Sequence, residues 1–254
     1  MTNSLRKLDF IIITPIFILL SHYLAVFFHE YAHSFMAFLL GYKQNPLDIH
    51  YGGKSLLNIF LLANIDQNVD YNILYSFGHT KEIAIIAAAG PVMNGVLYVV
   101  TLWMLKNRLT IRRFYRYYFL LLFNLMNLGN IYDYIPIRTF ATSGNMVDVL
   151  DIEKALHISP WWIYGSLGYL IAYMIWQFFS KTLTTAYSDL KLNETNLRAS
   201  LMIICVCLLF GYFGLPGFFS QGQIPFFLSF TSLSAIPGII VLLWPTHRKI
   251  IKKI

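Results

Sequence analysis

Long apolar runs separated by short polar stretches dominate the chain. The first run extends from about Leu8 to Gly41, and further apolar segments follow at about 82–105, 115–132, 161–179, 198–215 and 224–244. Because about 20 apolar residues cross a bilayer as a helix, this pattern predicts about six transmembrane helices. A continuous helix over the first run would be about 50 Å long, against about 30 Å of hydrocarbon. It must therefore tilt, protrude or break, and five spans is the alternative if it contributes differently.

The connection at 42–80 is neither clearly apolar nor clearly polar. Tyr51, Gly52 and Gly53 form a turn signal. The apolar stretch that follows, 55–65, is too short to span a membrane and is interrupted by asparagines. The pattern predicts a short strand or a re-entrant segment after the first helix.

Composition agrees with a membrane protein. Hydrophobic residues make up 57% of the chain and charged residues only 12%, whereas soluble domains carry about 25% charged residues. The predicted fold class is therefore an all-α polytopic membrane protein, integral to the lipid bilayer.

The net charge of +7 is concentrated at the ends of apolar runs, in the connection at 106–116 and in the C-terminal tail at 246–254. This distribution follows the positive-inside rule and argues against nucleic acid as a partner. It predicts cytoplasmic N- and C-termini, with the connections at 42–80 and 133–160 outside.

One pentapeptide in the first apolar run carries candidate chemistry: His29, Glu30, Tyr31, Ala32 and His33. Two histidines four residues apart on a helix can share a zinc ion, and the adjacent glutamate can take a proton from a water that the metal activates. The alternative is a structural helix whose polar residues are satisfied by neighbours. A charged residue at membrane depth is costly without a task, so metal binding is the favoured interpretation. The motif lies late in the first span, which places the metal nearer the outer face.

A catalytic zinc usually has three protein ligands, so one more is needed. Asp133, Asp148 and Asp151 all follow the third apolar segment and are candidates, although each can also be an ordinary loop carboxylate or helix cap.

The second apolar segment contains Gly90, Pro91 and Asn94 within a run of small residues. Small residues let helices approach closely, and the proline frees a backbone carbonyl. Asn94 is the candidate substrate-binding residue, and a packing seam with a helix–helix hydrogen bond is the alternative.

Together these motifs resemble the site-2 protease family of intramembrane zinc metalloproteases, which combines HExxH with Gly-Pro-x-x-Asn and a zinc-binding aspartate. The resemblance covers about residues 8–155, a membrane core of three spans and their connections. It leaves 156–254 as three further helices and a basic tail. It implies a Zn²⁺-dependent endopeptidase that hydrolyses peptide bonds in or next to membrane spans, with membrane proteins or membrane-adjacent peptides as substrates.

The chain departs from this family in the third motif. No Leu-Asp-Gly tripeptide occurs, and Asn145 follows Gly144 where an aspartate is expected. Because zinc bound by two imidazoles prefers an anionic third ligand, we expect Asp148 to be that ligand, with Asn145 and Asp133 as the alternatives.

The departure also supports a different function, in which a catalytically weakened or inactive member of the family acts as a membrane scaffold or transporter. A third possibility is another type of membrane zinc protease whose third ligand is a distant glutamate, and the candidates are Glu82, Glu153 and Glu194.

Overall fold

The computed structural model describes residues 7–62, 64–107, 114–143 and 148–249 of the chain. The described residues form helices and connections without a strand, so the predicted all-α class is confirmed. The helices are α1 (Lys7–Leu39), α2 (Leu56–Leu61), α3 (Tyr71–Ser76), α4 (Thr80–Lys106), α5 (Phe114–Tyr132), α6 (Asp148–Leu156), α7 (Pro160–Gln177), α8 (Leu183–Asp189), α9 (Thr195–Val206) and α10 (Gln223–Lys249). Shorter helical segments are η1 (Asp133–Ile137), η2 (Phe178–Thr182), η3 (Cys207–Gly211), η4 (Tyr212–Gly214) and η5 (Pro216–Phe218).

Four helical segments in the described part of the chain are long and apolar enough to cross a membrane: Asp9–Leu39, Thr80–Lys106, Thr195–Phe218 and Gln223–His247. They identify an α-helical membrane protein. The other two predicted spans correspond to α5 and to α7 with η2, which fall outside this set. The α1 helix continues through Pro15 for 33 residues, so of the three alternatives for the first apolar run, a break does not occur.

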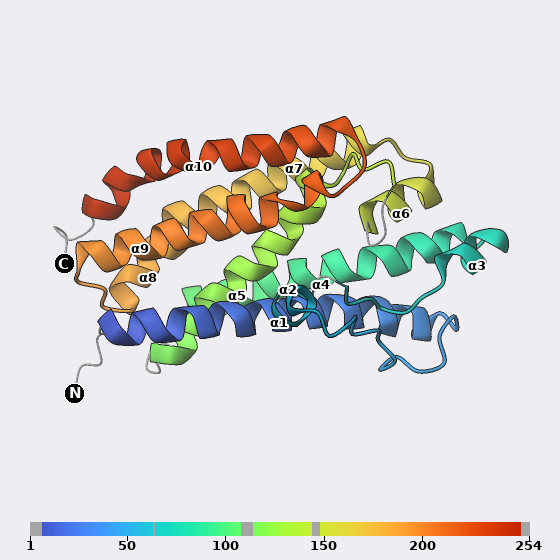
Figure 1. Ribbon diagram of the computed structural model, residues 1–254, viewed down its shortest axis with the longest axis horizontal. Helices are drawn as coiled ribbons and strands as arrows, with labels where there is room; N and C mark the ends of the chain where they lie inside the picture. The colour runs from blue at the N-terminus through green and yellow to red at the C-terminus, as the bar shows by residue number, and fades with distance from the viewer. Residues whose placement is uncertain (1–6, 63, 108–113, 144–147, 250–254) are drawn as a thin grey trace.

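The α5 helix occupies the centre of the molecule. It crosses the bundle diagonally in Figure 1, and residues 121–130 are all buried. The α1 and α4 helices pack against it and against each other, and α4 also packs against α6. This arrangement puts the end of α1, the middle of α4 and the start of α6 side by side.

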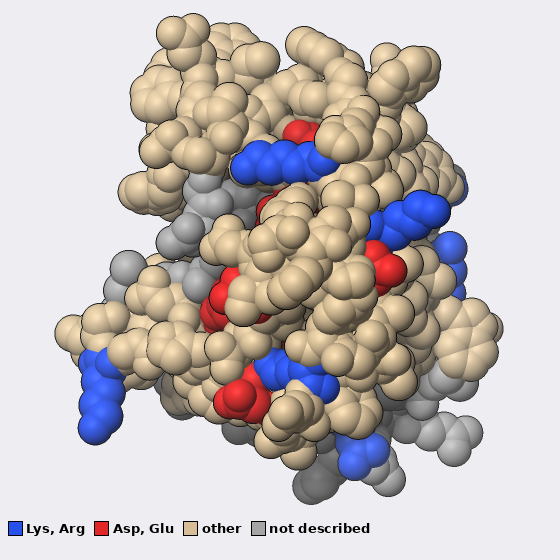
Figure 2. Space-filling view, turned by 90° about the vertical axis from the view of Figure 1, so that its right-hand side faces the viewer, with Lys and Arg blue, Asp and Glu red and all other residues tan. Residues whose placement is uncertain are grey.

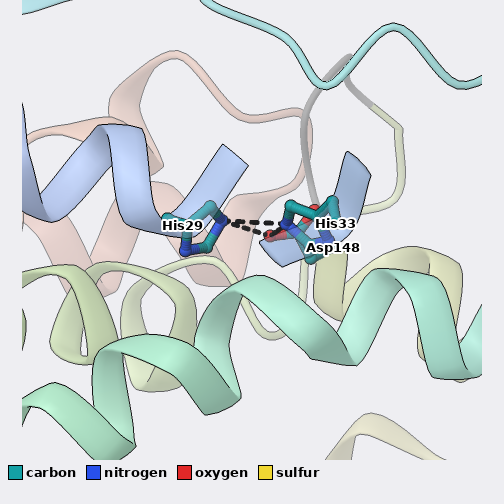
Figure 3. A group of neighbouring side chains, drawn as sticks. All are labelled: His29, His33 and Asp148. Atoms are coloured by element: carbon teal, nitrogen blue, oxygen red, sulfur yellow. Dashed lines mark hydrogen bonds and ion pairs between the residues drawn. The ribbon is translucent and has the colours of Figure 1, made fainter. Parts of the chain in front are cut away.

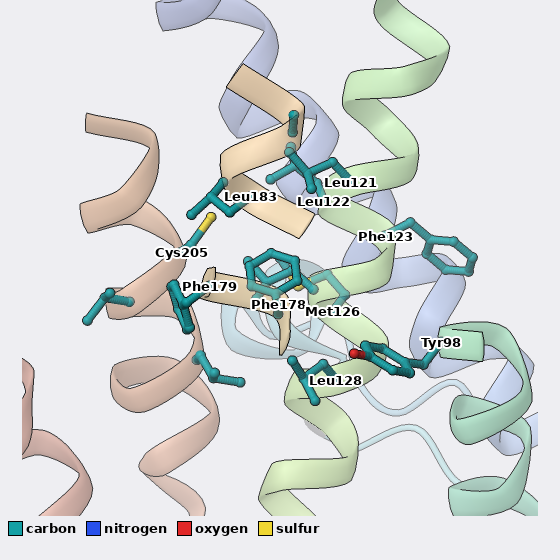
Figure 4. Close-up of a cluster of buried hydrophobic side chains, with 14 of the residues drawn as sticks. Tyr98, Leu121, Leu122, Phe123, Met126, Leu128, Phe178, Phe179, Leu183 and Cys205 are labelled. Atoms are coloured by element: carbon teal, nitrogen blue, oxygen red, sulfur yellow. The ribbon is translucent and has the colours of Figure 1, made fainter. Parts of the chain in front are cut away.

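One hydrophobic cluster continues across the predicted boundary between 8–155 and 156–254. It joins Phe10 and Tyr118 to Phe178 and Leu201. Figure 4 shows part of this cluster, where side chains of α5 meet those of η2, α8 and α9. The two predicted regions therefore share a core, and their separation into two domains stays a prediction.

The connection after α1 differs from the sequence-based prediction. The Ser55 hydroxyl accepts a hydrogen bond from the backbone N–H of Asn58 and caps α2. The Asn58 amide in turn donates to the backbone carbonyls of Tyr51 and Gly53. These local bonds favour a helical turn, so the expected strand is absent from the described residues, and β-pairing is limited to an isolated bridge between His50 and Asp66.

The α1 helix begins and the α10 helix ends at the same end of the molecule, on the left in Figure 1. The α3 and α6 helices lie at the opposite end. The basic residues that predict the topology lie partly outside the described residues, among them Arg6, Arg108, Arg112 and Arg113.

Candidate metal centre

The α1 helix carries three of the predicted site residues at the end of the molecule away from the termini. His29, Glu30 and His33 are 3%, 8% and 0% exposed. Residues four apart on a helix lie on one face, and the two imidazole rings are accordingly 4.7 Å apart between centroids. The helix alone thus brings two potential ligands together.

Asp148, the first residue of α6, completes the group (Figure 3). Its Oδ2 atom lies 3.0 Å from Nε2 of His29 and 3.3 Å from Nε2 of His33. The two Nε2 atoms are 3.0 Å apart. Donor atoms about 2.0–2.1 Å from a tetrahedral metal ion lie roughly 3.3 Å from one another. The three donors therefore have nearly the spacing of one face of a zinc coordination tetrahedron.

The other ring nitrogen of each histidine is held by an acceptor. His33 Nδ1 donates to the backbone carbonyl of Ile86 over 2.6 Å. His29 Nδ1 lies 2.6 Å from Oδ1 of Asn94. The Asn94 amide nitrogen faces the carbonyl of Ala25, which only accepts, so the amide oxygen must face His29.

Both Nδ1 atoms therefore carry the ring proton, and both Nε2 atoms point lone pairs toward Asp148. Two lone pairs and a carboxylate converging in a buried space repel one another unless a cation or protons lie between them. This donor set fits a metal ion, and the hydrogen bonds to Asn94 and Ile86 are of the kind that orient metal-binding histidines.

Gly90 of α4 provides the space for this arrangement. A Cβ atom on Gly90 would lie 2.2 Å from His33 Nε2 and 2.6 Å from His29 Nε2. Any other residue would therefore push against both ligand atoms. The sequence contains a signal for this role, because a glycine inside a helix often permits close approach of another group, but only the fold shows what approaches it.

The Glu30 carboxylate differs from the three candidate ligands in its hydrogen bonding. Its Oε2 atom is buried and has no hydrogen-bond partner in the part of the chain that the structure describes. His29, His33 and Asp148 all contribute to the electrostatic environment of this carboxylate. A buried carboxylate with a free oxygen beside three converging donors is placed to accept a proton.

Tyr134 in η1 forms a wall of the site. Its ring stacks on His29, with centroids 4.9 Å apart and planes at 8°. On its other side, the Arg138 guanidinium lies 4.3 Å from the ring centroid. Sequence reasoning missed Tyr134, because nothing in the local pattern signals that η1 turns back toward α1.

The alternatives for the third ligand lie elsewhere. The Asp133 Oδ2 atom accepts a hydrogen bond from Arg138 over 2.6 Å, so this carboxylate serves an ion pair next to the site. Asn145 lies outside the described residues. Of the distant glutamates, Glu82, Glu153 and Glu194 are all absent from the group of converging donors found among the described residues.

Asn94 has its hydrogen-bonding groups occupied. It is fully buried, and besides His29 it contacts Ala25 and, over 3.0 Å, Oδ1 of Asn127. Substrate binding by Asn94 therefore stays a prediction, and its contacts point instead to positioning of His29.

A polar pocket of about 710 Å³ has Asp148 in its wall. It lies between the segment before α3 and α6, at the end of the molecule that faces the viewer in Figure 2. It is lined by the 66–72 segment, Tyr75, and the polar face of α6 with Asp151 and Lys154. Burial and the neighbouring charge of Asp148 raise the pKa of Asp151 to about 6. Burial, followed by the Asp148 and Asp151 charges, also raises the pKa of the Tyr71 hydroxyl, which keeps it neutral.

Comparisons of the chain with protein-family profiles, with curated proteins and with solved structures return no match.

Proposed function

We propose that this protein is an intramembrane zinc endopeptidase of the site-2 protease type. The observation that carries the proposal is the convergence of His29, His33 and Asp148 beside Glu30, inside a bundle of apolar helices. When bound, zinc supplies Lewis-acid activation of water and of a peptide carbonyl. Hydrolysis of a peptide bond also needs a base, which the chain provides in Glu30.

In this mechanism Glu30 accepts the proton of the attacking water on its free Oε2 atom and then returns it to the leaving amine. Asn94 and the Ile86 carbonyl hold the two imidazoles in the tautomer that leaves Nε2 free. Tyr134 covers one face of His29 and limits its rotation. A helical substrate must unwind locally before its carbonyl can be attacked, because its backbone is internally hydrogen-bonded.

The membrane arrangement is part of the proposal. We infer six spans, with α5 and α7–η2 crossing the bilayer within the bundle, and both termini on the cytoplasmic side. The metal centre then lies nearer the outer face, since His33 is six residues, about 9 Å, from the end of α1. The common position of the start of α1 and the end of α10 supports this topology.

The test uses the purified full-length protein in detergent, with zinc measured by elemental analysis and cleavage of labelled casein as the activity. The wild-type chain should contain equimolar zinc and cleave casein. Glu30→Gln should retain zinc and lose about 100- to 10,000-fold in rate, as expected for loss of a general base. Asp148→Ala should lose both, and Glu82→Gln, a carboxylate change away from the site, should lose neither.

Absence of zinc from the wild-type protein, or wild-type cleavage by Glu30→Gln, would overturn the proposal. Zinc without cleavage of casein or of membrane-span peptides would favour the second candidate, a family member that acts as a scaffold or transporter. The substitution of Asn145 for the expected aspartate is the observation behind that candidate.

A further inference from the structure

A second hollow in the described part of the molecule lies on the side of the helix bundle, along the helices and away from the opening of the metal centre. It is a groove of about 720 Å³ between α4, α5 and α7. Its walls are almost entirely apolar, and they include Val92, Val96 and Val99 of α4 and Leu167 and Leu170 of α7. These five side chains are 41–61% exposed, so no other part of the described chain covers them.

The groove ends in a small pocket that carries positive charge. Leu102, Lys106 and Gln177 line both hollows, and Lys181, Thr182 and the Tyr117 ring line the small one. Lys106 and Lys181 have no carboxylate within ion-pair distance among the described residues. Lys181 instead lies over the Trp176 ring, with its Nζ 5.1 Å from the ring centroid. Two unpaired ammonium groups at the end of an apolar groove are complementary to an anion attached to a hydrocarbon chain.

We propose that this groove binds one anionic phospholipid, with an acyl chain along α4 and the phosphate between Lys106 and Lys181. Basic pockets between transmembrane helices are recognised sites for anionic lipid headgroups. The proposal goes beyond the proteolytic activity and does not depend on it.

The dimensions favour a lipid over a transmembrane helix. From Pro91 to Lys106 the groove follows α4 for about 22 Å. This is long enough for an acyl chain of one leaflet, about 15 Å deep, but shorter than the about 30 Å that a spanning helix crosses. A helix about 10 Å wide and 30 Å long occupies roughly 2,400 Å³, more than the space within the groove and its open mouth, about 1510 Å³. A single flexible chain can fill this space, whereas a helix can only lie across its mouth.

The end of the groove away from Lys106 is lined by residues that adjoin the metal centre in the chain. Pro91 follows Gly90, the residue beside the two histidine Nε2 atoms, and Ile135 follows Tyr134, which stacks on His29. A bound chain would therefore support the two segments that shape the site.

The test reconstitutes the full-length protein in phosphatidylcholine vesicles that contain brominated phosphatidylglycerol or, separately, brominated phosphatidylcholine. Bromine quenches nearby tryptophan fluorescence, and the difference between wild type and Trp176→Phe isolates the signal of Trp176, which lies beside Lys181. Wild type should show stronger quenching by the anionic lipid. The double variant Lys106→Gln, Lys181→Gln should lose about tenfold in this selectivity, because each lysine contributes up to about 1 kcal/mol to attraction of anionic lipid. Lys191→Gln, which removes an exposed charge outside both hollows, is the matched control.

A second variant tests the groove itself. A Cβ atom on Gly95 meets no atom within 4 Å, so Gly95→Leu adds a side chain to the open groove. It should remove the excess quenching of Trp176 by the anionic lipid, whereas quenching by bulk lipid, which reaches this half-exposed ring directly, should remain. Circular dichroism checks that each variant remains helical. Equal quenching by the two lipids, or unchanged quenching in Gly95→Leu, would overturn the proposal. Displacement of brominated lipid by a membrane-span peptide but not by unbrominated phosphatidylglycerol would overturn it as well, by showing that the groove receives a helix.

Discussion

The two halves of the bundle are stabilised in different ways. Around the metal centre, buried polar side chains are hydrogen-bonded in a chain from Asn127 to Asn94 to His29, and Asp148 converges on the other side of the His29 ring. In the other half, where η2, α8 and α9 meet α5, the fully buried residues include Phe178, Leu183 and Cys205 (Figure 4), and close packing of apolar side chains predominates.

The comparison separates what holds the bundle together from what shapes its site. Lipid is as apolar as leucine, so helices in a membrane associate through close packing and through hydrogen bonds between them. In the apolar half, stability depends on how closely the side chains fit together. Removing side-chain volume there should lower the free energy of unfolding without changing zinc binding or catalysis. In the polar half, the positions of the side chains depend on hydrogen bonds between them. Removing one hydrogen-bond partner there should lower zinc affinity before it lowers stability.

The largest effect is expected at Gly90, where close packing of two helices also shapes the metal site. Gly90→Ala places a methyl group against both histidine Nε2 atoms, so the metal position can form only if both rings move. We expect zinc affinity to fall at least about 1,000-fold, beyond the 10- to 100-fold typical of losing an outer partner, while helix content is kept. Competition with a zinc chelator measures the affinity. Gly95→Ala on the same helix is the control, because its added Cβ meets no atom within 4 Å. Equal zinc affinities in the two variants would show that Gly90 does not shape the site.

The opposite pattern is expected in the apolar half. Phe178→Ala removes a fully buried ring and leaves a cavity, and such substitutions cost about 3–5 kcal/mol. The free energy of unfolding, measured by denaturant titration in mixed micelles, should fall by about 3 kcal/mol, and the folded variant should keep its zinc affinity. Phe219→Ala, at a ring that is 85% exposed, should change stability little. Loss of zinc affinity in folded Phe178→Ala would mean that the two halves are not separable.

The site and the fold were predicted from different kinds of signal in the sequence. The HExxH spacing alone places His29, Glu30 and His33 together, and the demand for an anionic ligand points to Asp148, which the structure brings beside them. The Ile86 carbonyl and the Tyr134 ring have no such signal, because they reach the site only through the packing of α4 and the turn of η1. The helical turn at α2, where a strand was one of the two expectations, has a similar origin, because hydrophobic patterning does not reveal the side-chain hydrogen bonds of Asn58 that favour it.

A smaller effect is expected for the link between Asn94 and His29. Asn94→Ala removes the acceptor of the His29 Nδ1 proton, so the ring can rotate or change tautomer. Zinc affinity should fall about 10- to 100-fold, the usual cost of losing such a partner. Asn94→Asp keeps an acceptor oxygen and should recover most of the affinity. If both variants bind zinc as tightly as wild type, Asn94 is a packing residue and the polar chain does not position the ligand.

Glu153 of α6 sharpens the comparison because it is a buried carboxylate of the polar half whose Oε1 atom has no partner among the described residues. Burial raises its pKa from an ordinary value of 4.5 to about 7. Between these values the folded chain holds a proton that the unfolded chain has released, so stability is highest below about 4.5 and declines as the pH rises through 7. Glu153→Gln removes this decline and should be more stable than wild type at pH 8 by about 1 kcal/mol, a figure reduced for solvent screening.

The measurement is the free energy of unfolding of metal-free protein across the pH range from 5 to about 8.5, so that metal binding does not contribute and other titrating groups cancel in the difference. Glu194→Gln, an exposed carboxylate change at the start of α9, is the control. A wild-type curve parallel to that of Glu153→Gln would show that Glu153 finds a partner or water on folding. In that case Glu153 would be hydrogen-bonded in the folded protein. Glu30 would then be the carboxylate beside the metal centre whose oxygen remains free to accept a proton.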